Sequence, residues 1–161
     1  MKLLKYFPVI FLGLLACEPP RDLTYTGPTT VEFKNDRVNA AAATFLANNT
    51  FNSRTIRQII TQDSVLVQLV GVQREQPTEI SFEVASSSTA VEGTHYNFLG
   101  TKGKVTIPAK KSTAYIRLAI LQGIPTTVPA TQDFKLVLNL TGNADTKPSE
   151  NYKSFTFNIR R

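Results

Sequence analysis

The sequence predicts an all-β protein, a sandwich of two antiparallel sheets packed face to face. Three observations lead to this prediction. Seven short segments alternate apolar and polar residues with a period of two, which is the pattern of strands that bury one face. Turn-forming residues separate these segments, and few stretches favour a helix. Seven short strands with frequent turns are typical of a sandwich and less typical of a barrel.

The predicted strands follow one another from residue 31 to residue 159. The second contains consecutive apolar residues rather than alternating ones, which indicates a more central strand. The fourth ends at Pro108, which has no N–H to donate to a ladder. The seven apolar cores lie at residues 31–33, 65–70, 80–84, 105–107, 116–120, 134–140 and 155–159.

Residues 39–62 give conflicting signals. The alanines at 40–43 favour the start of a helix, whereas residues 44–46 have the composition of a strand fragment. Ile56, Ile59 and Ile60 have helical spacing. We expect a short helix or an irregular insertion here, covering one end of the sandwich.

The first sixteen residues have the three-part layout of an export signal, with Lys2 and Lys5 before an apolar run and small residues before Cys17. Leu14 to Cys17 reads LLAC, which resembles a bacterial lipobox. The resemblance implies that Cys17 becomes the first mature residue and carries a diacylglycerol, usually with a third acyl chain. A transmembrane helix needs about 20 apolar residues, more than this run supplies. Ordinary cleavage with a free Cys17 thiol is the alternative.

This layout divides the chain into three parts. Residues 1–16 form the signal peptide, and residues 17–28 form the lipidated cysteine and a flexible tether with three prolines and one glycine. Residues 29–161 form one domain. Removing the signal leaves 16 basic against 12 acidic residues and a net charge of +4. The basic residues are scattered along the chain, so we expect no nucleic-acid binding.

The segment 89–121 carries a family resemblance. It contains an Ala, a Gly and a Tyr before a strand, then a Pro-Ala turn and a long alternating strand, a pattern that resembles the core of Calx-beta domains. The matching residues are Ala90, Gly93, Tyr96, Val105, Ile107, Pro108 and Ala109. Gly93 allows a backbone turn with positive φ, and Tyr96 can bury its ring at a sheet corner. The resemblance implies an immunoglobulin-like, Calx-beta-like sandwich.

The whole chain resembles Calx-beta-like lipoproteins of unknown function from the Bacteroidota. Shared features are the lipobox, the tether, a Val-Glu-Phe first strand, Leu-Val-Gly at 69–71, EGTHY at 92–96 and Asn-Tyr at 151–152. The resemblance implies an outer-membrane lipoprotein, at the cell surface or on the periplasmic face. It also implies a non-catalytic binding or accessory role beside a nutrient (glycan) transporter and its companion lipoproteins. A free-standing glycan-binding or adhesin-like module is the alternative.

Metal binding and catalysis are not expected. Calx-beta calcium sites use clustered carboxylates, whereas His95 and Gln122-Gly123 occupy those positions here and Glu92 stands alone. His95 is the only histidine, and we interpret it as a structural loop residue. The acidic residues form no obvious catalytic pair, and no phosphate-binding glycine loop is present. We therefore expect no enzyme activity and no cofactor. The acidic residues weighed are Glu79, Glu83, Glu92, Asp133, Asp145 and Glu150.

Candidate ligand-binding residues are few, because sugar platforms rely on exposed aromatic rings and the chain has no Trp. Tyr115 faces outward if Ile116 faces the core, and Arg117 alternates to the same side. We take Tyr115, Arg117 and Tyr152 as candidates, although Tyr152 also fits the start of a strand and Tyr25 fits the tether.

Residues 63–65 read Asp-Ser-Val, which matches the short Asp-Ser/Thr-apolar sequence that Bacteroidota use for O-glycosylation. Ser64 would be the acceptor. The alternative interpretation is the polar start of the strand that begins near Val65. The sequence leaves both interpretations open.

Overall fold

The computed structural model describes residue 25 and residues 27–36 and 51–161. The predicted signal peptide, the predicted lipidation site at Cys17 and residues 39–50 of the expected helix or insertion lie outside these ranges. Within them, no helix has both the length and the hydropathy needed to cross a membrane.

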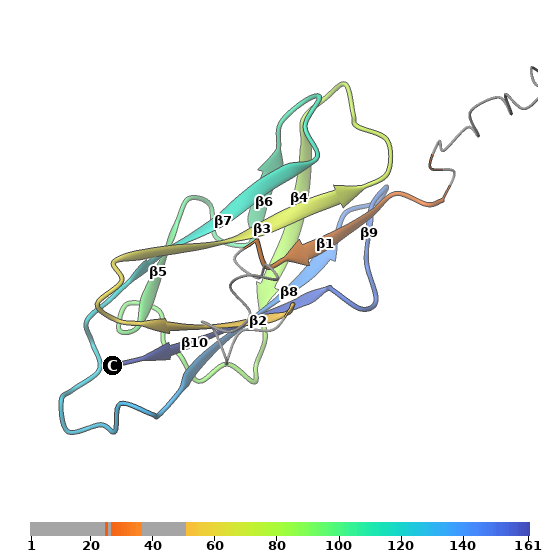
Figure 1. Cartoon of the computed structure of the whole chain (residues 1–161). Coiled ribbons are helices and arrows are strands. Elements are labelled where there is room, and N and C mark those ends of the chain that lie inside the picture. Colours follow the sequence, from red (N-terminus) through yellow and green to blue (C-terminus); the bar gives the residue numbers. More distant parts are fainter. Residues whose placement is uncertain (1–24, 26, 37–50) are drawn as a thin grey trace, which may run out of the picture.

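The described residues form ten strands in two five-stranded sheets that pack as a sandwich. Figure 1 shows the two layers. The first sheet contains, in spatial order, β5 (Tyr96–Leu99), β7 (Thr113–Ile120), β3 (Gln62–Val70), β1 (Thr30–Lys34) and β9 (Lys147–Pro148). The second contains β2 (Ser53–Arg57), β10 (Ser154–Arg160), β8 (Phe134–Gly142), β4 (Thr78–Val84) and β6 (Lys104–Ile107).

The predicted all-β sandwich is confirmed, and each of the seven predicted segments lies in a strand: β1, β3, β4, β6, β7, β8 or β10. The structure adds three short strands, β2, β5 and β9. Most strand pairs are antiparallel, but β2 runs parallel to β10 and β9 runs parallel to β1. The sheets are therefore not purely antiparallel, because two short segments add alongside strands that are distant in the sequence.

The expectation for residues 39–62 is wrong where the structure can be compared with it. Residues 53–57 form β2 rather than a helix or an irregular insertion, and they pair along their whole length with β10. Ile56 is buried in that strand, whereas Ile59 and Ile60 are exposed in the turn before β3. The helical spacing of these three isoleucines was thus coincidental, since pairing with β10 outweighs local propensity.

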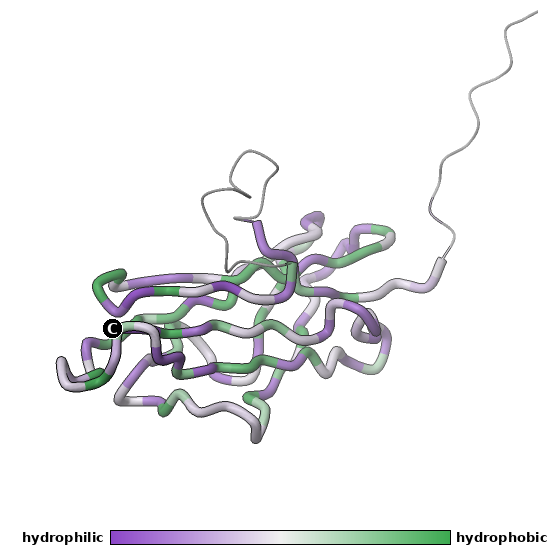
Figure 2. Tube along the Cα trace, turned by 60° about the horizontal axis from the view of Figure 1, so that its bottom comes forward, coloured by the Kyte–Doolittle hydropathy of each residue, from purple (hydrophilic) through white to green (hydrophobic). Residues whose placement is uncertain are grey.

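The core lies between the sheets and takes alternate residues from the strands of both. Figure 2 shows the resulting alternation of apolar and polar residues along the trace. Phe155 and Phe157 of β10 are fully buried, and the Phe155 ring lies 5.9 Å from that of Phe33 on β1. β3 lies at the centre of its sheet with Val65, Leu66 and Val67 all buried, as its continuous apolar run predicted.

The turn before β5 has the features expected from the Calx-beta resemblance. Gly93 adopts a φ of 81°, and the Tyr96 side chain is 2% exposed. His95 is buried between them, where its Nδ1 accepts a hydrogen bond from the Val91 N–H at 2.8 Å and its ring stacks on Phe134 at 4.3 Å. Burial lowers the pKa of His95. The histidine therefore fixes the loop, as a structural residue would.

Candidate functional site

The first sheet has an incomplete edge, because β5 is much shorter than β7. β5 pairs only with residues 117–120 of β7, and the chain leaves the sheet after Leu99. Gly100 marks this departure with a φ of 127°, a conformation that glycine adopts readily. The next residues turn into β6, which belongs to the other sheet. Residues 113–116 of β7 therefore have β3 on one side and, among the strands that the structure describes, none on the other.

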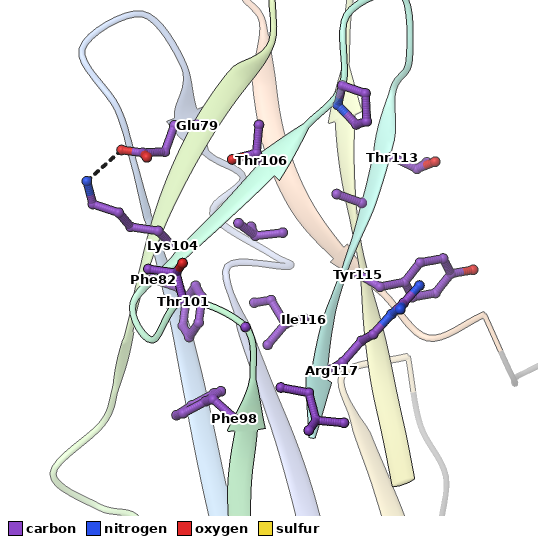
Figure 3. A pocket seen from close by; sticks show the side chains of 15 residues that line it. Glu79, Phe82, Phe98, Thr101, Lys104, Thr106, Thr113, Tyr115, Ile116 and Arg117 are labelled. Atoms are coloured by element: carbon purple, nitrogen blue, oxygen red, sulfur yellow. Dashed lines mark ion pairs between the residues drawn. The ribbon is translucent and has the colours of Figure 1, made fainter. Parts of the chain in front are cut away.

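A groove lies between this part of β7 and β6, the edge strand of the second sheet. We call it the β6–β7 groove. Its volume is about 390 Å³, within the usual range for ligand sites. Figure 3 shows it from close by. The lining combines buried or partly buried apolar side chains with residues of both strand edges: Phe82, Phe98, Val105, Ala114 and Ile116, and Lys104, Thr106, Thr113, Tyr115 and Arg117.

The charges around the groove differ between its walls. On the β6 side, Lys104 Nζ lies 2.8 Å from Glu79 Oε1, so the two charges offset one another. On the β7 side, Arg117 is exposed and forms no ion pair with a residue in the described ranges. The groove therefore has one cationic group available to a ligand, at the point where β5 ends.

Two of the three predicted ligand-binding residues, Tyr115 and Arg117, line this groove. Both side chains lie on the opposite face of β7 from Ile116, as Figure 3 shows. Ile116 is 4% exposed and Tyr115 is 43% exposed, so the expected orientation is correct. The Tyr115 hydroxyl donates to Asp36 Oδ2 at 3.2 Å, and this hydrogen bond to a carboxylate raises the pKa of Tyr115. Ligand contact by these residues stays a prediction.

Tyr152 is not part of the groove. It lies in the turn before β10, where its N–H donates to the Ser149 carbonyl and its own carbonyl accepts from the Phe33 N–H at 2.8 Å. Its side chain is 40% exposed. The structure thus separates Tyr152 from the other two candidates. Tyr25 donates its hydroxyl to the Pro28 carbonyl at 2.9 Å, just before β1.

Ser64, the predicted O-glycosylation site, lies inside β3 and pairs with Arg117 of β7. It is half-buried, and its N–H donates to Asp63 Oδ1 at 2.7 Å. Since β3 begins at Gln62, Asp63 and Ser64 belong to the strand itself. Modification of Ser64 stays a prediction.

A buried polar group that we call the Arg54 cluster joins the two sheets. Arg54 of β2 is 2% exposed, and its guanidinium lies 3.0 Å from Asp63 Oδ1 on β3. It also donates to Asn35 Oδ1 at 3.2 Å and to the Ser64 carbonyl. The guanidinium carbon lies 5.4 Å from the centre of the Phe157 ring, within cation–π range. These contacts make the cluster a structural link between the sheets.

Sequence reasoning missed both the Arg54 cluster and the groove. Arg54 stands among polar residues, a context that does not distinguish a buried guanidinium from an exposed one. The groove had one local signal, the Gly-Thr-Lys-Gly turn at 100–103 between Phe98 and Val105. That turn predicts a chain reversal but not the transfer of the chain from one sheet to the other.

Four of the six acidic residues weighed as catalytic candidates form ion pairs with basic side chains: Glu79, Glu92, Asp133 and Glu150. Glu92 pairs with Lys102 at 2.5 Å, and Glu150 pairs with Lys153 at 2.8 Å. The hydrogen bond from Lys153 lowers the pKa of Glu150, the opposite of the shift that a general acid needs. In the described part of the chain, no three histidine, cysteine or acidic side chains are grouped as metal ligands.

No family model and no curated protein matches the chain. Solved structures do: the apo-form Calx CBD1 domain has a TM-score of 0.54 at 14% identity, covering 84% of this chain and 100% of that domain. CBD12 from CALX1.2 has a TM-score of 0.51 at 20% identity, covering 68% of this chain and 42% of the longer neighbour. The Calx CBD2 domain has a TM-score of 0.50 at 11% identity, covering 68% and 82%. At these identities the likeness shows a shared Calx-beta-like, immunoglobulin-like fold.

Proposed function

We propose that this protein is a lipid-anchored accessory module of the outer membrane, which binds a partner protein through the β6–β7 groove and takes part in nutrient (glycan) uptake. The observation that carries the binding role is the groove itself, where an apolar floor lies between two incompletely paired strand edges. Protein interfaces combine buried apolar centres with polar rims. The groove has both components.

The envelope location rests on the lipobox resemblance and on charge and hydropathy at the N-terminus. Two or three acyl chains on Cys17 would hold the protein at a membrane, because each buried methylene contributes about 0.8 kcal/mol. Intact mass spectrometry of the native protein tests this part. We expect a mass equal to the chain from Cys17 plus its acyl groups, and an unmodified cysteine would contradict the anchor.

A non-catalytic role fits the residues that could carry chemistry. His95 has its Nδ1 occupied by the Val91 N–H and its ring buried against Phe134. Glu92 and Glu150 each face a lysine rather than a second carboxylate. These arrangements favour binding over acid–base catalysis.

Glycan binding by a free-standing module is the second candidate, and the exposed Tyr115 ring favours it. A sugar platform needs an aromatic face with polar neighbours. Arg117 and Asp36 supply polar groups on the same side, since Tyr115 donates to Asp36. Because this platform rests on a single exposed tyrosine ring, glycan binding is the second candidate.

The test is recovery of the native acylated protein from its own membranes in mild detergent, followed by mass spectrometry of stoichiometric partners. We expect a transporter or companion lipoprotein to co-purify. Leu99→Asp places a charge at the groove and should abolish recovery of the partner. Val72→Asp is the matched control, because both side chains are exposed but Val72 lies outside the groove. Recovery of the chain alone would contradict the accessory role, and glycan screening with Tyr115→Ala would then test the second candidate.

A further inference from the structure

The hydrogen-bonding direction of β7 alternates along the strand. The Ile120 N–H donates to the Thr61 carbonyl at 2.9 Å, toward β3, and the Leu121 N–H donates to the His95 carbonyl at 2.9 Å, toward the β5 side. Because peptide groups of alternate residues point to opposite sides of a strand, even-numbered residues of β7 face β3. Thr113 and Tyr115 therefore direct their N–H and C=O groups away from β3. Since β5 does not reach this far, these groups face the groove.

The β6 wall of the groove also directs backbone N–H and C=O groups into it. The Phe82 N–H donates to the Gly103 carbonyl at 2.9 Å, so odd-numbered residues of β6 face β4. Thr106 consequently directs its N–H and C=O toward the groove. The Lys104 N–H is already used in the turn, where it donates to the Thr101 carbonyl. Two strand edges whose outward backbone groups bond to no described residue thus border the β6–β7 groove.

The occupant that matches this arrangement is an extended peptide. Available backbone donors and acceptors in a row pair best with another strand. Side chains of an added strand would alternate between solvent and the floor formed by Phe98 and Ile116. Arg117, exposed and outside any ion pair with a described residue, would attract a carboxylate at the end of the groove.

We propose that an extended segment of a partner protein adds as a strand to residues 113–116 of β7, continuing the line of β5. The segment carries apolar side chains at alternate positions and an acidic residue beside Arg117. This inference rests on the proposed binding function of the groove and gives its mode of recognition.

The test uses the full acylated chain in detergent micelles and a random dodecapeptide library displayed on phage. We expect enrichment of peptides with alternating apolar residues and an acidic residue. Hydrogen exchange at the Thr113 and Tyr115 amides should slow when a selected synthetic peptide binds. Arg117→Glu should weaken the binding of that peptide.

Two proline variants test whether the peptide pairs with the edge of β7 or with the edge of β6. Thr113→Pro removes an N–H that faces the groove at the first residue of β7, a position where proline is tolerated. It should weaken the selected peptide about tenfold. Thr106→Pro removes the corresponding N–H on β6 and should leave affinity within about twofold. Circular dichroism and melting curves check that both variants fold.

The outcomes of these experiments distinguish failure of strand addition from failure of the proposed accessory role. Failure to enrich any peptide, or equal binding by Thr113→Pro, would overturn the inference, as would a loss confined to Thr106→Pro. A membrane partner that co-purifies normally with Thr113→Pro would overturn strand addition while leaving the proposed function intact. Selected peptides that bind as described, with no protein partner recovered from membranes, would overturn the accessory role and keep the recognition mode.

Discussion

The two sheets are linked by polar contacts at the Arg54 cluster, whereas at the β6–β7 groove their strand edges remain apart. At the cluster, Arg54 of β2 reaches Asp63 of β3 across the sheets, and both residues are buried. At the groove, β6 and β7 face one another without pairing, and the backbone groups of Thr113 and Thr106 on that side bond to no residue in the described ranges. Polar groups are thus satisfied internally at one place and available to solvent or a partner at the other.

This difference separates residues that stabilise the fold from residues that are available to bind a partner. Removing one partner of a buried ion pair leaves an uncompensated charge and strongly lowers the free energy of unfolding. Replacing the whole pair by apolar residues changes that free energy much less. An open strand edge costs little in the free protein, since water satisfies its backbone groups, but it can recruit another strand. Substitutions at the cluster should therefore affect folding, and substitutions at the groove rim should affect binding.

The largest effect should come from Asp63→Ala, which removes the nearer and more deeply buried carboxylate of Arg54 and leaves it, among the described carboxylates, Asp36 Oδ1 at 3.7 Å. We expect the free energy of unfolding to fall by about 3–5 kcal/mol, measured by urea denaturation. Glu83→Ala is the control, because Glu83 is exposed on β4 and its loss should change stability by less than about 0.5 kcal/mol. A loss below about 1 kcal/mol for Asp63→Ala would show that the cluster does not hold the sheets together.

A second comparison uses two phenylalanines. Phe155 is fully buried beside the Arg54 cluster, whereas Phe98 is partly buried at the groove floor. Phe155→Ala should cost about 3–5 kcal/mol, and Phe98→Ala roughly half as much, because less area and a smaller cavity are involved. Thermal unfolding of both variants measures the difference. Equal losses would mean that the groove floor is packed as tightly as the core.

Adjacent prolines in β7 give a smaller contrast. Ala114→Pro removes an N–H that faces β3, and we expect a loss of about 2 kcal/mol because a ladder hydrogen bond disappears. Thr113→Pro removes an N–H that faces the groove and should cost less than about 1 kcal/mol. Urea unfolding of the pair tests the assignment of directions. A larger loss of stability for Thr113→Pro than for Ala114→Pro would show that the Thr113 N–H, and not that of Ala114, bonds to β3.

The smallest effect is a pH dependence at His95, which is buried and forms no ion pair with any residue that the structure describes. Burial lowers its pKa in the folded state, so the unfolded chain binds more protons below its own pKa of about 6.5. This contribution to stability is complete above about pH 6.5 and is lost as pH falls toward the lower folded value, with a slope of at most about 1.4 kcal/mol per pH unit. His95→Gln should remove that slope in urea unfolding at a series of pH values. An unchanged slope in the variant would assign the dependence to other groups.

The strand positions were predictable because burial imposes a local pattern. Ile116 and Leu118 alternate with Tyr115 and Arg117, and the structure places the first two inward and the others outward. The same rule placed two of the candidate ligand-binding residues on one strand face. It could not show that Tyr152 lies elsewhere, because distance between turns depends on how the sheets pack.

The amino-acid sequence by itself determined the fold class, the seven main strands and the inward or outward direction of their side chains, since these follow from period-two alternation. Only the tertiary structure decided that residues 53–57 join β10, that Arg54 is buried against Asp63, and that β5 leaves the first residues of β7, 113–116, without a partner on that side among the described strands. These features depend on which strand edges meet across the chain. Pairing between distant segments is a property of the packed sheets, and no local pattern encodes it.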